Sequence, residues 1–487
     1  MTLMLSVSGC RGVVGESLTP EVATRYAGAF AAFVRSTSAG KPVTVVLGRD
    51  GRAGGNMLHH AALTGLLASG AHVVDVGIAM TPTVAVATDR FATDNPNDAV
   101  AGMVLTASHN PQQWNGLKCL LRSGPGAGAD GGVSAAAPPA ALAAQIIGRF
   151  ERRELDLVGW DRLGGVSDAE GAAGLHVERV LGALSDGGFG EPFAIGAELG
   201  VVVDSVNASG VAGAAALMEV LGVSEFLHLG AEDTGIFPHP PEPTEENLGG
   251  AGGLCDAVRE HQADVGFAQD PDADRLAIVD EKGRYIGEEY TLALSALAIL
   301  SAMKKSGAAT EGRVFATNLS TSRMLDDVCA GFGARVVRTP VGEANVVEAM
   351  KREHALGGGE GNGGIIWPRT TYVRDSLTAM SLVMWLIRSR REPLSRIVAS
   401  VPSYAIRKRK VALGRKEDAV GAVERVAAAF SGERVDRSDG AWVDLASRRS
   451  WLHVRASNTE PIMRLIAEAP TVEEADRLLD SAAGAMA

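Results

Sequence analysis

Val43-Thr44-Val45-Val46-Leu47-Gly48-Arg49-Asp50-Gly51-Arg52 is the stretch that decides the fold of this chain. Its first five residues are apolar or β-branched without interruption, and a polar turn with two glycines follows. A helical pattern then runs over residues 59–67. A continuous apolar run indicates a strand that is buried on both faces, and a helix after such a strand is typical of a parallel sheet. The stretch therefore predicts an α/β fold.

The same opening occurs twice more along the chain. Residues 201–203 are three valines that lead into the polar turn 204–210, and residues 314–317 lead into the turn 318–322. Helical patterns follow both turns. We therefore expect three similar α/β domains in tandem, with mixed, mainly parallel sheets.

The final stretch of the chain has a different pattern. Strand-like runs at 408–413, 441–445, 451–455 and 463–468 stand beside helical patterns at 418–430 and from 472 onward. This pattern predicts a smaller α+β domain. A chain of 487 residues suits three or four domains of about 100–150 residues each. The predicted boundaries are 1–160, 161–283, 284–396 and 397–487.

Composition narrows the class of protein. The net charge is −12, from 46 Lys and Arg against 58 Asp and Glu, and a nucleic-acid binder would show a basic balance. The one short basic run, Arg407 to Lys410, is interpreted as a solvated strand end. Cys10, Cys119, Cys255 and Cys329 form no CxxC pair, which favours reduced thiols in a cytoplasmic protein. We expect no signal peptide and no membrane span.

The first candidate site is Thr106-Ala107-Ser108-His109-Asn110-Pro111. An apolar strand over residues 99–105 delivers this segment to a loop, and ligands of α/β domains bind at the carboxyl ends of strands. Free serine needs an activating neighbour to act as a nucleophile. His109 is adjacent to Ser108, and Lys118 is close in sequence. The alternative is an Asn-Pro turn with a satisfied histidine.

The second candidate site is Asp270-Pro271-Asp272-Ala273-Asp274-Arg275. Alternate residues of an extended chain face one side, so the three carboxylates converge. Oxygen-only ligands suit magnesium or calcium. With Glu281 in the twelfth place the segment resembles an EF-hand loop, but Arg275 stands where the sixth position needs glycine. Strand-like runs on both sides also disagree with an EF-hand, and a simple charged turn is the remaining alternative.

The third candidate site is the glycine-rich stretch 357–364, in which Glu360 and Asn362 carry the functional side chains. A carboxylate beside an amide can bind adjacent sugar hydroxyls. A dinucleotide-binding loop is disfavoured because Ile-Ile-Trp-Pro stands where the helix should follow. The alternative is a flexible turn.

The fourth candidate site is Arg455-Ala456-Ser457-Asn458-Thr459-Glu460-Pro461, with Arg464 beyond it. Arginine, two hydroxyls, an amide and backbone N–H groups can together bind a phosphate. The alternative is a polar turn between two strands.

Taken together, the four segments resemble the α-D-phosphohexomutase superfamily of phosphoglucomutases, phosphomannomutases and phosphoglucosamine mutases. The resemblance covers nearly the whole chain and includes the segments 8–12, 48–52 and 339–345. It implies a four-domain, heart-shaped enzyme around a central cleft, with one motif from each domain.

The resemblance also implies roles for the motif residues. Ser108 is similar to the phosphoserine of the family. Asp270, Asp272 and Asp274 are similar to its magnesium ligands, which hold one Mg²⁺ with a phosphoserine oxygen, and Arg275 lies beside them. Glu360 and Asn362 are similar to the sugar-selecting pair. The family's site for the phosphate that is not reacting is resembled here by five residues: Arg455, Ser457, Asn458, Thr459 and Arg464.

The remaining assignments concern the serine loop and two departures from the family. Arg11 is expected to steady the serine loop, and Lys118 or His109 to act as the general base. Pro271 stands where the family often has glycine. Gly364 stands where many relatives have the histidine of a Ser-Gly-His sequence. If that histidine assists proton transfer in the relatives, another group must do so here.

The implied activity interconverts hexose 6-phosphate and hexose 1-phosphate through a hexose 1,6-bisphosphate, which also serves as activator. Residues 359–364, 341–345 and Arg374-Asp375 resemble the archaeal-type phosphoglucosamine mutases, so glucosamine phosphate is the expected sugar. A dual phosphomannomutase/phosphoglucomutase and a non-catalytic sugar-phosphate binding protein are the alternatives. A serine hydrolase is disfavoured because a G-x-S-x-G elbow is missing at Ser108. Hexose phosphates are the expected partners of a monomer or homodimer.

Overall fold

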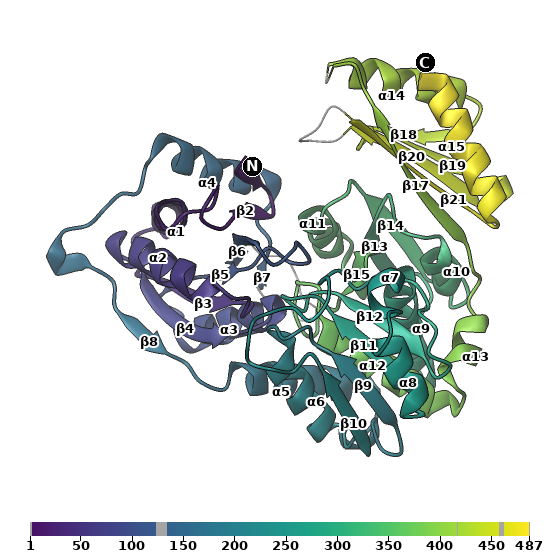
Figure 1. Cartoon of the computed structure of the whole chain (residues 1–487), viewed down its shortest axis with the longest axis horizontal. Helices are drawn as coiled ribbons and strands as arrows, with labels where there is room; N and C mark the ends of the chain where they lie inside the picture. Colours follow the sequence, from purple (N-terminus) through teal and green to yellow (C-terminus); the bar gives the residue numbers. More distant parts are fainter. Residues whose placement is uncertain (1, 123–133, 416, 457–461, 487) are drawn as a thin grey trace.

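The computed structural model describes residues 2–122, 134–415, 417–456 and 462–486. Four β-sheets follow one another along these residues, each with its own helices (Figure 1). The units lie in an arc in this view, with the N-terminal and C-terminal units at its two ends. The expected succession of α/β units is therefore present.

The first unit is built on an eight-stranded sheet with the order β1-β2-β6-β5-β3-β4-β8, in which β7 pairs with β6. The stretch that decides the fold forms β3 at its centre, and β3 is parallel to both β4 and β5. The strands are β1 (Met4–Ser6), β2 (Gly9–Val13), β3 (Val43–Arg49), β4 (His72–Ile78), β5 (Ala99–Leu105), β6 (Trp114–Arg122), β7 (Ala135–Ala136) and β8 (Val166–Asp168). The helices are α1 (Pro20–Thr37), α2 (Gly55–Ala68), α3 (Thr81–Asp94) and α4 (Ala140–Arg152).

The second and third units each contain a four-stranded sheet with one common topology. The orders are β10-β9-β11-β12 and β14-β13-β15-β16. The strands are β9 (Gly200–Asp204), β10 (Glu225–Leu229), β11 (Val265–Gln269), β12 (Leu276–Asp280), β13 (Val314–Asn318), β14 (Arg335–Thr339), β15 (Gly357–Glu360) and β16 (Gly364–Ile366). The helices are α5 (Ala172–Asp186), α6 (Gly210–Val220), α7 (Glu245–Leu248), α8 (Leu254–Glu260), α9 (Glu289–Lys305), α10 (Met324–Ala330), α11 (Glu343–Glu353), α12 (Ser376–Arg390) and α13 (Leu394–Ala399).

The three α/β units repeat one pattern of strand pairing. In each unit a central strand is parallel to the next two strands in sequence, and a fourth strand pairs antiparallel with the third. The strands β4-β3-β5-β6 of the first sheet follow this order. The expectation of three similar tandem α/β domains with mixed, mainly parallel sheets is confirmed.

This shared topology places the candidate sites. The loop between the third and fourth strand carries Ser108 in the first unit, the three aspartates in the second, and the segment after Glu360 in the third. Three motifs that are far apart in sequence therefore occupy the same position in three copies of one topology.

The second and third units share a single core. Helices α9 and α12 are apolar on nearly all faces because they pack between these units. Phe267 of β11 and Phe315 of β13 are both fully buried in this cluster, and Trp385 of α12 joins it. The two units are thus held as one packed body.

The fourth unit is an antiparallel sheet with the order β17-β21-β20-β19-β18 and two helices, as expected of an α+β domain. It has a core of its own and meets the third unit through a small cluster of Leu319, Trp442 and Trp451. Its elements are β17 (Ala405–Ala412), α14 (Asp418–Ala429), β18 (Arg434–Asp436), β19 (Ala441–Leu445), β20 (Ser450–Ala456), β21 (Ile462–Ala469) and α15 (Val472–Met486).

Two expectations from composition can be compared with the structure. All four cysteines are buried and free. Among the described residues, every helix is too short or too polar to cross a membrane.

The shared core predicts a large stability effect at Phe315. Phe315→Ala should lower the free energy of unfolding by about 3–5 kcal/mol, because a fully buried ring would leave a cavity. Urea unfolding would measure the change. Phe193→Ala is the matched control, since that ring is 64% exposed. Equal effects of the two substitutions would contradict the shared core.

Candidate active site

Ser108 lies in the loop between β5 and β6, and its backbone is left-handed, with φ 51°. Arg52, from the turn after β3, donates from Nη2 to the Ser108 carbonyl oxygen at 2.6 Å. Arg52 is itself paired with Asp50 at 2.8 Å, and both side chains are buried. The Ser108 N–H donates to Thr106 Oγ1 at 2.8 Å. The polar turn of the opening stretch therefore holds the serine loop in place.

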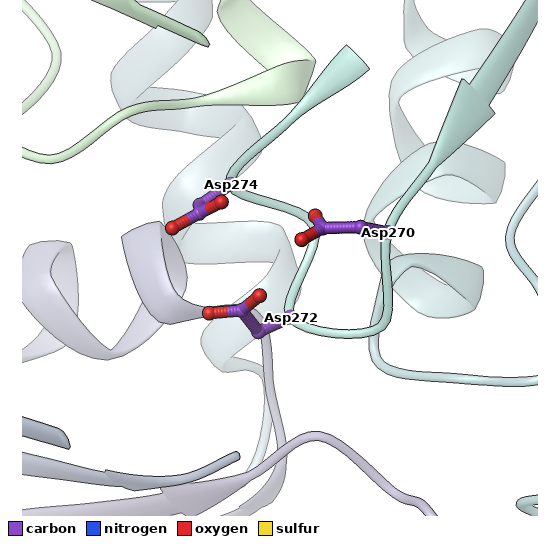
Figure 2. Close-up of side chains that lie close together, drawn as sticks. All are labelled: Asp270, Asp272 and Asp274. Atoms are coloured by element: carbon purple, nitrogen blue, oxygen red, sulfur yellow. The ribbon is translucent and has the colours of Figure 1, made fainter. Parts of the chain in front are cut away.

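The three aspartates of the second unit come together as expected (Figure 2). Asp270, Asp272 and Asp274 are completely buried, and one oxygen from each lies within 4.8 Å of the others. Ser108 Oγ donates to Asp270 Oδ2 at 2.7 Å. The serine hydroxyl of one unit thus lies at the acidic cluster of the next.

Cations and hydroxyls from other elements compensate part of this negative charge. Lys118 Nζ lies 2.8 Å from Asp272 Oδ2 and 3.0 Å from Asp274 Oδ2. Thr81 Oγ1 donates to Asp272 Oδ2 at 2.7 Å, and Arg374 Nη2 to Asp274 Oδ2 at 2.8 Å. Burial lowers the pKa of Lys118, but the two carboxylates outweigh burial and raise that pKa above its ordinary value. Lys118 is therefore held as a cation.

Part of the negative charge stays without a partner among the described residues. Asp272 Oδ1 and Asp274 Oδ1 are buried and lack a hydrogen-bond partner. Burial, and then the neighbouring Asp272 and Asp274, raise the pKa of Asp270 well above its usual range. Converging, unsatisfied carboxylate oxygens are a donor set for a hard cation such as Mg²⁺. Since strands β11 and β12 flank the loop, the EF-hand alternative is wrong.

Three further predicted residues surround Ser108. His109 Nδ1 lies 3.3 Å from Ser108 Oγ. Burial, and then Arg275 and Arg11, lower the pKa of His109 to about 3. Arg11 Nη1 donates to Asn110 Oδ1 at 3.5 Å. Arg275 Nε lies 3.9 Å from Asp274 Oδ1, beyond hydrogen-bond reach.

The sugar-loop candidates are held by a separate set of contacts. Glu360 Oε1 accepts from Asn318 Nδ2 at 2.8 Å, and Asn362 Oδ1 accepts from Arg374 Nη1 at 3.1 Å. Both side chains line a cavity of about 610 Å³ between the third and fourth units, which His109 also lines. The sugar loop and the serine loop therefore face one space.

The fourth unit contributes cations to this cavity. Arg455 and Arg464 line it, whereas Ser457, Asn458 and Thr459 lie outside the described residues. Lys410 pairs in register with Arg464, and Arg464 with Arg455, so three cations cross β17, β21 and β20 in one row. Like charges opposite one another destabilise a sheet unless an anion compensates them. Asp439 Oδ1 compensates part of this charge, because it lies 3.4 Å from Arg455 Nε, and all three cations line the cavity.

Sequence reasoning missed several members of the site. Lys408, Arg409 and Lys410 lie on β17, with Lys408 and Lys410 exposed as expected of a solvated strand, and all three also line the cavity, which their sequence did not indicate. The turn 48–52 and the pair Arg374-Asp375 belong to the family resemblance, but the sequence assigns neither Arg52 nor Arg374 a contact in the site. Thr81 gives no sequence signal, because its partner is 191 residues away.

Four domain families match the chain in order. They are described as Phosphoglucomutase/phosphomannomutase, alpha/beta/alpha domain I at residues 3–131, domain II at 194–283, domain III at 290–404, and C-terminal domain at 408–485. Fold and site thus define a phosphohexomutase, and the chain belongs to the phosphoglucomutase/phosphomannomutase family. Phosphohexomutases are isomerase-class phosphotransferases.

Individual relatives match along their whole length. A phosphoglucomutase/phosphomannomutase of Thermococcus kodakarensis is 32% identical and covers 99% of this chain and 97% of its own. A probable phosphoglucosamine mutase of Methanopyrus kandleri is 35% identical, and the match covers 97% of this chain and 95% of that relative. The crystal structure of a phosphoglucomutase/phosphomannomutase family protein from Burkholderia thailandensis matches with a TM-score of 0.77 at 25% identity. The match covers 99% of this chain and 98% of that chain.

The unsatisfied carboxylates predict the result of removing one ligand. Asp272→Asn should weaken Mg²⁺ binding about 10–100-fold, because one of three anionic donors becomes a neutral amide. Isothermal titration of Mg²⁺ into metal-free protein would measure the change. Asp168→Asn, on the exposed strand β8, is the control. Unchanged Mg²⁺ affinity in Asp272→Asn would contradict a metal site at this cluster.

Proposed function

We propose that the protein interconverts hexose 6-phosphates and hexose 1-phosphates through a phosphorylated Ser108 and a hexose 1,6-bisphosphate intermediate. The observation that carries this proposal is the 2.7 Å hydrogen bond from Ser108 Oγ to Asp270 within a buried acidic cluster. A serine beside buried carboxylates can carry a phosphoryl group only if cations offset the negative charge of that group. Lys118, Arg11 and Arg275 are the nearby cations.

In the first half-reaction the phosphoserine gives its phosphoryl group to the free hydroxyl of the sugar phosphate. The bond between Ser108 Oγ and phosphorus breaks, and a bond between the sugar oxygen and phosphorus forms. The proton released by the sugar hydroxyl ends on Ser108 Oγ. A general base must take this proton from the sugar hydroxyl and pass it on, and we assign that role to the unprotonated His109, whose Nδ1 lies 3.3 Å from Ser108 Oγ. Lys118 is held as a cation and therefore cannot accept the proton.

The three aspartates and a phosphoserine oxygen would hold one Mg²⁺, which when bound offsets charge on the transferring phosphoryl group. Lys118 adds a fixed positive charge at the same place, and Asp270 orients the serine oxygen. Positioning and charge compensation of this kind are the main requirements of phosphoryl transfer.

In the second half-reaction the bisphosphate turns end for end, and its other phosphoryl group returns to Ser108. The phosphate that is not reacting must be held by a site that accepts either end of the sugar. We assign this role to Arg455, Arg464 and Lys410 of the cation row. Ser457, Asn458 and Thr459 are proposed to complete the site.

The proposed sugar is glucosamine phosphate, to be selected by Glu360 and Asn362. The relative from Methanopyrus kandleri with the name probable phosphoglucosamine mutase supports this choice. The relative from Thermococcus kodakarensis supports the alternative of a dual phosphomannomutase/phosphoglucomutase. We propose that the enzyme acts on soluble hexose phosphates in the cytoplasm, as a monomer or homodimer.

The role of Ser108 predicts a nearly complete loss of turnover in Ser108→Ala. The rate should fall by at least about 10³-fold, because the phosphoryl carrier is lost. A coupled mutase assay with Mg²⁺ and a trace of hexose 1,6-bisphosphate measures the rate, and intact mass should show a phosphoryl group on wild type only. Ser167→Ala, on exposed β8, is the control. Normal turnover in Ser108→Ala would overturn the mechanism and revive the non-catalytic binding protein.

The choice of sugar has its own test. Glucosamine, mannose and glucose 6-phosphates would be compared side by side in the same assay. We expect kcat/KM to be highest for glucosamine phosphate. A higher value for mannose or glucose phosphate, or similar values for all three, would leave the mutase proposal standing and replace the sugar assignment by the dual enzyme.

A further inference from the structure

Arg374 lies in the segment between β16 and α12, and it is 7% exposed. Each nitrogen of its guanidinium reaches a polar partner on a different segment. The contacts are Nη2 to Asp274 Oδ2 at 2.8 Å, Nε to Glu343 Oε2 at 2.6 Å, Nη1 to Asn362 Oδ1 at 3.1 Å and Nη1 to Glu360 Oε2 at 3.3 Å. One side chain thus joins the acidic cluster to both sugar-loop candidates.

The space for this side chain depends on Gly364. Gly364 pairs with Glu360 in the hairpin of β15 and β16. A Cβ atom at position 364 would lie 2.2 Å from Arg374 Cδ and 2.7 Å from Cγ. Because such distances are impossible, the observed course of the Arg374 stem requires glycine at position 364. Gly364, which stands where many relatives have a histidine, therefore leaves the space that the Arg374 side chain occupies.

The backbone beside Arg374 is fixed on both sides. The Leu276 N–H donates to the Gly363 carbonyl oxygen at 2.8 Å, which ties the end of the aspartate loop to the sugar loop. Ser376 Oγ donates to the Ala273 carbonyl oxygen at 2.7 Å, within the aspartate loop itself. Arg374 is therefore held between two loops whose backbones are already joined.

We infer that Arg374 is a positioning residue that fixes Glu360 and Asn362 relative to Asp274, so that sugar selection and metal affinity depend on one side chain. This inference rests on the proposed function for its sugar and its metal. The planar fork of arginine is essential, because a lysine ammonium at the same place could not reach four partners in fixed directions. Loss of the Arg374 guanidinium should therefore change sugar selection and Mg²⁺ affinity together.

The first test is Arg374→Lys, which keeps the positive charge. Mg²⁺ affinity of the metal-free protein, measured by calorimetry, should fall about 10–100-fold, as for a lost partner of a metal ligand. The ratio of kcat/KM between preferred and poorer sugars should fall about 10-fold, because Glu360 and Asn362 lose their common donor. The matched control is Arg284→Lys, since Arg284 pairs with buried Asp280 at the far end of β12.

The second test uses Gly364→Ala, which displaces the Arg374 stem and should reproduce the effects of Arg374→Lys. In Gly364→Ala/Arg374→Ala the Cγ and Cδ atoms are absent and only the Cβ at position 374 remains, 3.1 Å from a Cβ at position 364, so the double variant should lose much less than the sum of the two single losses. This non-additivity is the signature of two residues that share one space. Additive losses would overturn the shared-space argument.

The outcomes separate this inference from the proposed function. If wild type shows no mutase activity, the proposed function fails, and Mg²⁺ titration of Arg374→Lys and Gly364→Ala still tests the link to Asp274. If wild type is active and Arg374→Lys keeps its sugar preference and Mg²⁺ affinity, the positioning role is wrong. If Arg374→Lys does not fold, Gly364→Ala decides by the same two measurements.

Discussion

The structure depends on the burial of three carboxylates, those of Asp270, Asp272 and Asp274, within 4.8 Å of one another. Like charges this close in a medium of low dielectric repel strongly, and each loses its hydration. Arg275 of the same unit lies 3.9 Å from Asp274 Oδ1, but the cations in hydrogen-bond contact come from outside the second unit, since Lys118 lies on β6 and Arg374 precedes α12. The cluster is therefore tolerable only when three units are docked together, and the remaining unsatisfied oxygens favour a divalent cation.

Repetition of one topology explains why these groups meet. In each α/β unit the motif residues lie in the loop between the third strand and its antiparallel partner or, for Glu360, at the end of that third strand. One residue of each loop has a positive φ: Ser108, Ala273 and Gly363. The same hairpin thus carries a hydroxyl in one unit, carboxylates in the next, and a carboxylate with an amide in the third. Chemistry differs between the units while the supporting hairpin stays the same.

The fourth unit stands apart from this arrangement. Its core is its own, and its contact with the third unit includes the small cluster around Trp442. Its row of cations nevertheless lines the cavity opposite Glu360. Ion pairs and hydrogen bonds such as Arg323 to Asp444 also join the fourth unit to the third, so the cation row is held at the cavity by contacts that do not involve the acidic cluster.

Local pattern was enough to predict the α/β class, several of the buried strands, the four motifs and the convergence of the three aspartates, because apolar periodicity and close spacing depend only on neighbours in the chain. The α+β character of the last unit follows from the same information. Spacing could not reveal which groups neutralise the cluster. Thr81 and Asp272 are 191 residues apart, and Arg374 reaches Asp274 across 100 residues. Only the docking of the units decided those pairs, because the free energy of a buried charge depends on whatever side chains the fold brings within a few ångströms.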